Sequence, residues 1–282
     1  MGLLDFSEFG VKKELDLYDQ PEKKGGAGGA AAQKSKTKEE IELELLFDKS
    51  YDCPVCGSKL TEKKVRSGKI KLIGSDYMLR ARYEQLEPLK YGTVTCHTCG
   101  YAALDRFFTS ITSPQINLIK ENVASNFKDK PAPNGIYSYE YALEMHKLAL
   151  LNAVVKKGRA SERAFICLKM AWLCQSWIES LSEDNPDRDA IIAECNENMK
   201  ELYKNACEGF AAAISTEPFP MCGMDDMTVT YLVAALYMEC GEYDKALKML
   251  SEIIANPAVK NNLKDKARDL KDEIQNRKKS AK

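Results

Sequence analysis

Two short cysteine motifs are the residues of this chain best suited to chemistry. Cys53-Pro-Val-Cys56-Gly57 and Cys96-His-Thr-Cys99-Gly100 each place two thiols three residues apart and follow them with glycine. Two such turns supply the four thiolates of the tetrahedral sulfur environment that Zn²⁺ prefers. The glycine allows a tight turn that points backbone N–H groups at the sulfur atoms. The spacing predicts one metal site, with the ligands Cys53, Cys56, Cys96 and Cys99.

The expected metal is one structural zinc ion per chain. Four cysteines fill all coordination positions and leave none for a substrate. Iron uses the same four thiolates, so the spacing leaves zinc and iron both open. A redox-active pair is expected at a helix start beside a βαβ unit, and neither motif has that setting. His97, inside the second motif, is expected to be solvated or bonded to backbone rather than to act as a fifth ligand.

A small β domain must position the two motifs, and we place it at residues 44–104. Residues 91–95 read as a strand that leads into the second motif. The 39 residues between the motifs exceed what a minimal zinc ribbon needs, so this ribbon is expected to carry an insertion that includes residues 76–83. Residues 1–43 are expected to be a short apolar head followed by a flexible tether rich in glycine, alanine and lysine. The head is expected either to dock on the chain itself or to bind a partner.

The pattern from residue 105 to 282 is helical. Helices are expected at 139–157, 162–181, 188–214, 226–240, 242–255 and 261–278. A small-large-small pattern recurs in three of them and looks like a tetratricopeptide repeat, although its copies are 64 and 40 residues apart rather than 34. The fold class is therefore α+β and mostly α, with a zinc ribbon followed by a tetratricopeptide-like helical domain. The repeated positions are Ala142, His146 and Ala149; Ala206, Phe210 and Ala213; and Ala246, Leu250 and Ile253.

Catalytic motifs are not found in the sequence, so we expect a protein that is not an enzyme. His-Glu-x-x-His, Gly-x-Ser-x-Gly and the phosphate-binding loop are all missing. His146 occupies a large position of the repeat and is expected to pack in the core. The six cysteines outside the motifs are expected to be buried apolar residues, with Cys222 in the loop 217–226 as the best candidate for a reactive thiol.

Composition gives the compartment and limits the partners. Zinc thiolates beside unpaired cysteines imply a reducing compartment, and the N-terminus lacks the pattern of a signal peptide. The net charge is −1 and no apolar run is long enough to span a bilayer. We expect a cytoplasmic protein that does not bind membranes.

Several segments together resemble one bacterial family, the domain of unknown function 2225 family. They are residues 47–57, 64–69, 89–102, 219–225 and 264–269, and the resemblance covers about residues 44–275. It implies a zinc ribbon fused to a tetratricopeptide-like body, with the four motif cysteines as metal ligands. The family has no assigned activity, so the resemblance supports the architecture and leaves the substrate or partner open.

Three functions fit the sequence. The first is a non-enzymatic zinc-binding adaptor that binds a protein or peptide through its helical repeats. The second is a nucleic-acid-binding regulator, because residues 49–99 carry ten basic and five acidic side chains with tyrosines among them. The third is a thiol redox protein. We expect the adaptor.

Overall fold

Three antiparallel hairpins precede a helical body in this computed structural model, which describes residues 37–128 and 132–280. The described residues form eight α-helices and six strands, which confirms the predicted mostly helical α+β class. The strands are β1 (Leu46–Asp52), β2 (Lys59–Val65), β3 (Leu72–Ser75), β4 (Ala81–Tyr83), β5 (Thr93–Thr95) and β6 (Ala102–Leu104). The helices are α1 (Lys38–Glu44), α2 (Ser113–Ile119), α3 (Tyr139–Val155), α4 (Ala160–Ser180), α5 (Arg188–Thr216), α6 (Asp226–Glu239), α7 (Tyr243–Ala255) and α8 (Asn261–Ser280).

Two of the hairpins carry the cysteine motifs at their tips. Strands β1 and β2 pair in register as far as Asp52 opposite Lys59, and the first motif fills the connection between them. Strands β5 and β6 pair as far as Thr95 opposite Ala102, and the second motif fills that connection. Each hairpin therefore presents its two thiols at one end.

The six long helices lie where the sequence predicts them, to within about two residues at most ends. All nine positions of the small-large-small pattern are buried. Small residues at these positions let neighbouring helices approach closely, which is the reason for the pattern. The burial agrees with the packing role that we predicted, while the assignment to tetratricopeptide repeats stays a prediction.

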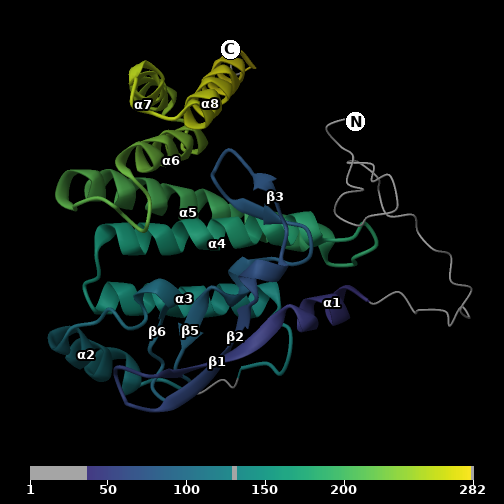
Figure 1. Cartoon of the computed structure of the whole chain (residues 1–282), viewed down its shortest axis with the longest axis vertical. Coiled ribbons are helices and arrows are strands. Elements are labelled where there is room, and N and C mark those ends of the chain that lie inside the picture. Colours follow the sequence, from purple (N-terminus) through teal and green to yellow (C-terminus); the bar gives the residue numbers. More distant parts are fainter. Residues whose placement is uncertain (1–36, 129–131, 281–282) are drawn as a thin grey trace, which may run out of the picture. The chain divides into compact units, whose positions relative to one another are not determined.

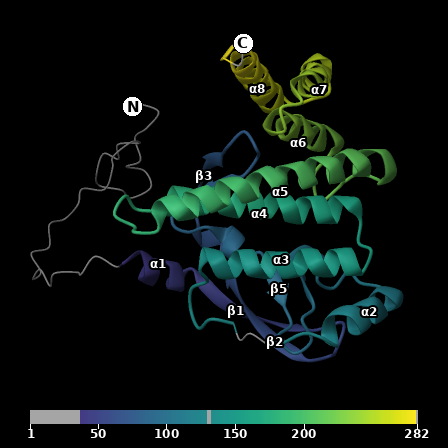
Figure 2. The same cartoon turned by 180° about the vertical axis from the view of Figure 1, so that it is seen from behind.

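Helices α3, α4 and α5 lie side by side, with α4 between the other two (Figures 1 and 2). The contact between α4 and α5 is close because Ala164 faces Gly209. A Cβ atom added at Gly209 would lie only 2.8 Å from the Cβ of Ala164. This close approach fixes the spacing of the two helices.

The predicted insertion joins the ribbon to the helices. It forms the hairpin β3–β4 and the turn before β4, whose Met78 belongs to the same hydrophobic cluster as residues of α4 to α8. Arg80 is buried and donates to Ser176 Oγ (2.7 Å) and to the Glu179 carboxylate (2.6 Å), both on α4. The described residues thus belong to one compact unit, Thr37–Lys282.

The predicted domain limits at 43/44 and 104/105 stay predictions. The predicted head and most of the predicted tether fall in residues 1–36, which lie outside the described residues. The last part of the predicted tether forms α1, which begins with a capping box between Thr37 and Glu40. Within the described chain, no helix combines the length and the apolar character needed to cross a membrane.

Candidate metal centre

The two cysteine turns have the same backbone geometry. In the first turn the N–H of Gly57 donates to the carbonyl of Cys53 at 2.9 Å, and in the second the N–H of Gly100 donates to the carbonyl of Cys96 at 2.8 Å. The two glycines have φ values of +76° and +72°, in the left-handed region that favours glycine. This confirms that the glycine after each second cysteine allows a tight turn, although its own N–H group bonds a carbonyl oxygen rather than a sulfur atom.

The four sulfur atoms come together between the hairpin tips. All four lie within 4.8 Å of one another. The Sγ atoms of Cys53 and Cys99 are 3.7 Å apart, and those of Cys56 and Cys96 are 3.6 Å apart. A tetrahedral site with metal–sulfur bonds of about 2.3 Å requires sulfur–sulfur distances of about 3.8 Å. The arrangement therefore fits a metal ion held by the four predicted cysteines.

Hydrogen bonds to and among the thiols shift their pKa values in opposite directions. Contacts with the thiols of Cys53 and Cys99, and with backbone N–H groups of its own turn, hold the pKa of Cys96 far below the usual range. Hydrogen bonds with the thiols of Cys53 and Cys96 raise the pKa of Cys99. Crowded thiols of this kind favour loss of protons to a cation, because a bound metal replaces the protons that they share.

A small hydrophobic cluster fixes the second turn on the helical body. Tyr101 is buried and its hydroxyl donates to the carbonyl of Phe108 at 2.9 Å. Asn152 of α3 is also buried, and its side-chain amide donates to the carbonyl of Gly100 at 2.9 Å. Of the four cysteines in the cluster, only Cys56 is exposed. The second turn is therefore anchored on α3, while the first reaches it from the β1–β2 hairpin.

The chain matches one protein family over residues 46–274, and that family is described as an uncharacterized protein conserved in bacteria, DUF2225. The chain belongs to this family. The match agrees with the resemblance inferred from the sequence and covers both the ribbon and the helical body. No curated protein and no solved structure matches the chain.

Neither of the two histidines of this DUF2225 chain belongs to the cluster of four sulfur atoms. His97 Nε2 lies 3.5 Å from the hydroxyl of Tyr141 on α3. His146 is fully buried, and its Nδ1 lies 2.7 Å from the carbonyl of Ala142. Burial lowers the pKa of His146 to about 4, so the imidazole is neutral at physiological pH. The core position agrees with the predicted packing role.

Several of the ribbon's basic side chains are buried and form ion pairs within the protein. Lys64, Arg80 and Lys90 are all buried, and each contacts a carboxylate. Two of the tyrosine hydroxyls also bond carboxylates of the protein: Tyr91 donates to Glu42 at 2.7 Å, and Tyr77 donates to Glu239 at 3.0 Å. Nucleic-acid binding through the ribbon stays a prediction, with fewer free cations than the sequence implies.

The loop with Cys222 packs against the start of α4. The Cys222 thiol donates to the carbonyl of Ser161 at 3.4 Å, and burial raises its pKa to about 11. The neighbouring Met221 is buried, and the carboxylate of Glu217 accepts hydrogen bonds from Ser161. A thiol with a raised pKa is a weak nucleophile at neutral pH. The redox function therefore gains no support from this loop.

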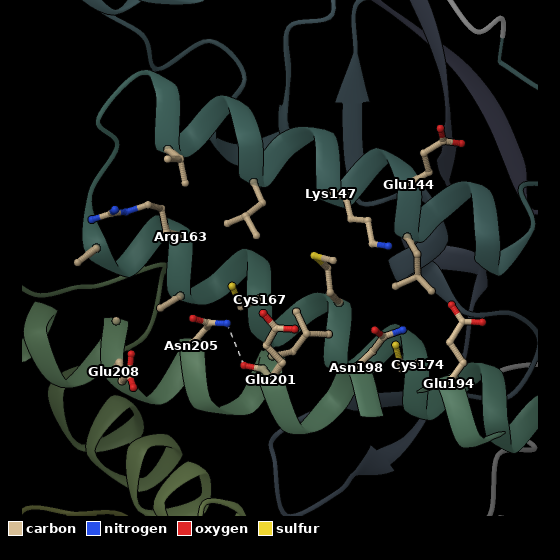
Figure 3. Close-up of a pocket in the computed structure, with 18 of the residues that line it drawn as sticks. Glu144, Lys147, Arg163, Cys167, Cys174, Glu194, Asn198, Glu201, Asn205 and Glu208 are labelled. Carbon is tan, nitrogen blue, oxygen red and sulfur yellow. Dashed lines mark hydrogen bonds between the residues drawn. The ribbon is translucent and has the colours of Figure 1, made fainter. Parts of the chain in front are cut away.

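A groove formed by α3, α4 and α5 was not predicted from the sequence. Its volume is about 1140 Å³, and α4 forms its floor between walls from the other two helices (Figure 3). Cys167 and Cys174 lie on the floor and are buried, as predicted. The prediction that all six cysteines outside the motifs are buried is wrong for Cys240, which is exposed, and Cys222 is only partly buried. The seven-residue spacing of Glu194, Glu201 and Glu208 on α5 could have drawn attention to one wall, but not to the opposite wall from α3.

Proposed function

We propose that this DUF2225 protein is a non-enzymatic adaptor, in which a structural zinc ion holds the ribbon and the helical groove binds a segment of another protein. Four cysteines in two turns form the donor set that structural zinc sites use. Their sulfur–sulfur distances of 3.6 and 3.7 Å fit such a site. Zinc bound there draws the two hairpin tips together, because each hairpin contributes two ligands. We place the protein in the cytoplasm, where thiolates persist.

The groove on α3, α4 and α5 is the observation that carries the adaptor function. A volume of about 1140 Å³ exceeds the range of about 300–1000 Å³ typical of small-molecule sites. The lining runs from Glu140 to Val154 on α3, which corresponds to about 21 Å of helix. Val154 stays about half exposed (50%) although it is apolar. An elongated groove with exposed apolar side chains suits a polypeptide segment better than a compact ligand.

Metal analysis tests the first half of the proposal. Protein purified without added metal is expected to contain one zinc ion per chain and to be colourless. One iron ion per chain, with thiolate-to-metal absorption in the visible spectrum, would contradict the structural zinc site and favour electron transfer.

Photo-crosslinking tests the second half. Val154 and Leu151 are both 50% exposed on α3, but only Val154 lines the groove. A photo-reactive amino acid at position 154 is expected to crosslink to one defined protein segment in bacterial cells, identified by mass spectrometry, while the same residue at position 151 is not. Equal crosslinking at both positions, or none at position 154, would argue against an adaptor that acts through this groove.

A further inference from the structure

The lining of the groove carries an excess of negative charge, and all floor residues of α4 except Arg163 are apolar. Five carboxylates line the groove against two cations, Lys147 and Arg163, which gives a net charge of −3. The floor residues of α4 include Ala160, Ala164 and Cys167, which are small and leave space above the helix. The carboxylates belong to Glu140, Glu144, Glu194, Glu201 and Glu208.

The carboxylates of α5 are evenly spaced. Glu194, Glu201 and Glu208 are seven residues apart, and Figure 3 shows them in order along α5. Seven residues are two turns, so neighbouring carboxylates are about 10.5 Å apart along the axis and drift by only ~20° around it. All three are exposed, and within the described chain none of them forms an ion pair; α5 pairs Glu197 with Lys200 instead (3.0 Å). These negative charges are available to a partner.

The backbone of the groove favours a helical partner. Helices form all three sides, so their N–H and C=O groups are already used within α3, α4 and α5. An extended peptide gains most of its affinity from main-chain hydrogen bonds to a sheet edge, and this groove offers no such edge. A helix satisfies its own backbone and needs only side-chain contacts. A helix bound in the groove would lie about 8–10 Å from the axis of α4, with α3 and α5 on either side of it.

We propose that the groove binds a basic amphipathic α-helix of another protein, with Lys or Arg residues seven positions apart facing Glu194, Glu201 and Glu208. The apolar side of this helix packs on the small residues of α4 and on Val154 of α3. About 14–18 residues cover the 21–27 Å over which α3 and α5 line the groove. The inference rests on the proposed adaptor function and adds the chemical class of its partner.

A designed peptide tests this partner class. The probe is an 18-residue fluorescent helical peptide with lysines at positions 3, 10 and 17 and one stripe of leucine and alanine. Fluorescence anisotropy with the full-length zinc-loaded protein is expected to show saturable binding. The affinity is expected to fall at least tenfold between 50 and 300 mM NaCl, because exposed charges are screened over shorter distances at higher salt. A peptide with the same composition but scrambled lysine spacing is expected to bind at least tenfold more weakly.

Matched variants locate the binding. We expect peptide binding to weaken at least tenfold in a triple variant that combines Glu194→Lys, Glu201→Lys and Glu208→Lys. The control triple variant is expected to change binding less than twofold; it combines Glu183→Lys, Glu252→Lys and Asp272→Lys. The control residues are also exposed and lie outside the groove.

Val154→Asp is expected to weaken binding at least tenfold and Leu151→Asp less than twofold. Equal binding of the two peptides, or equal effects of the matched variants, would overturn the proposal.

The alternative occupants give different results. Binding that appears only after residues 1–36 are removed would assign the groove to the chain's own segment. Dimerisation that Val154→Asp abolishes would assign it to a second copy. Either result overturns the proposed partner. If position 154 crosslinks to a protein segment while the basic peptide fails to bind, the partner class is wrong and the adaptor function stands; if neither is observed, both fail.

Discussion

Single residues decide whether the metal centre forms. Cys53 is buried and its thiol contacts that of Cys99 at 3.7 Å, whereas Cys56 is exposed at the edge of the cluster. Loss of any ligand leaves three thiolates, and a structural zinc site gains its stability from a complete tetrahedral set. The second turn is also anchored on α3 through Asn152, whereas the first turn lies at the tip of a hairpin with only two strands.

Cys53→Ser is therefore expected to release the metal and unfold the ribbon while the helical body persists. The measurements are metal content per chain, far-ultraviolet circular dichroism and limited proteolysis of residues 46–104. Cys222→Ser is the control and is expected to retain one metal ion, because Cys222 lies outside the cluster. A Cys53→Ser protein with a fully protected ribbon would refute the structural role of the metal.

Glu87 gives the protein a pH dependence that is separate from the metal. Burial raises the pKa of its carboxyl above the ordinary value near 4.5, although Ser176 Oγ donates to it at 2.6 Å. The folded protein then holds this proton more tightly than the unfolded chain does. The stabilising contribution of Glu87 is fully present below pH 4.5 and is lost as the pH rises through the raised folded value.

Glu87→Gln removes this titration. The unfolding free energy of the wild type minus that of the variant is expected to fall as the pH rises from 4.5 to 7.5, measured by urea unfolding at equal metal content. Glu252→Gln, at an exposed position on α7, is the control and is expected to show no such trend. A difference that stays constant or increases with pH would contradict the raised pKa of Glu87.

At the scale of elements, α4 and α5 pack closely at the groove. Ala164 and Gly209 meet at this contact, and both residues line the groove. Glycine inside a helix normally costs about 0.5–1 kcal/mol relative to alanine. Here a methyl group at position 209 would overlap the methyl group of Ala164. Overpacking costs about 1–3 kcal/mol, which outweighs the gain in helix propensity.

Gly209→Ala is therefore expected to destabilise the protein by about 1–2 kcal/mol, although alanine is the better helix former. Urea unfolding followed by circular dichroism measures the change. Gly68→Ala is the matched control and is expected to change stability by less than about 0.5 kcal/mol, because a Cβ atom at position 68 meets no atom within 4 Å. Stabilisation by Gly209→Ala would show that the two helices separate without cost.

At the scale of the whole described unit, the insertion holds the ribbon on the helical body through the contact of Arg80 with α4. Arg80 lies between Asp76 of the same segment and Glu179 of α4, at 2.9 and 2.6 Å. Its side chain is only 3% exposed, so its removal leaves two carboxylates without their buried partner. Breaking a buried ion pair in this way costs about 3–5 kcal/mol.

Arg80→Ala is expected to destabilise the protein by about 3 kcal/mol, at the lower end of that range because both carboxylates are partly exposed. Hydrogen exchange is expected to increase in residues 72–83 and at the end of α4. Arg82→Ala is the control: its side chain is 52% exposed and lies 3.6 Å from Glu179, so a loss below about 1 kcal/mol is expected. Similar losses of stability in Arg80→Ala and Arg82→Ala would show that the buried contact of Arg80 with α4 is not needed to hold the insertion in place.

Local sequence patterns determined the four-cysteine cluster, the class of fold and the helices. The cysteine turns could be predicted because the ligand spacing and the positive φ of Gly57 and Gly100 depend on a few neighbouring residues. The helices could be predicted because apolar periodicity and small residues recur over short distances, as at Ala206, Phe210 and Ala213.

Tertiary structure alone decided where the charges and the groove lie. In the sequence Arg80 is one of ten basic residues between positions 49 and 99, and only the packing of residues 76–83 on α4 shows that it is buried in an ion pair. The groove brings Val154 and Glu201 to opposite walls although they are far apart in the chain. Such contacts depend on how helices pack, and short-range periodicity contains no information about which faces meet.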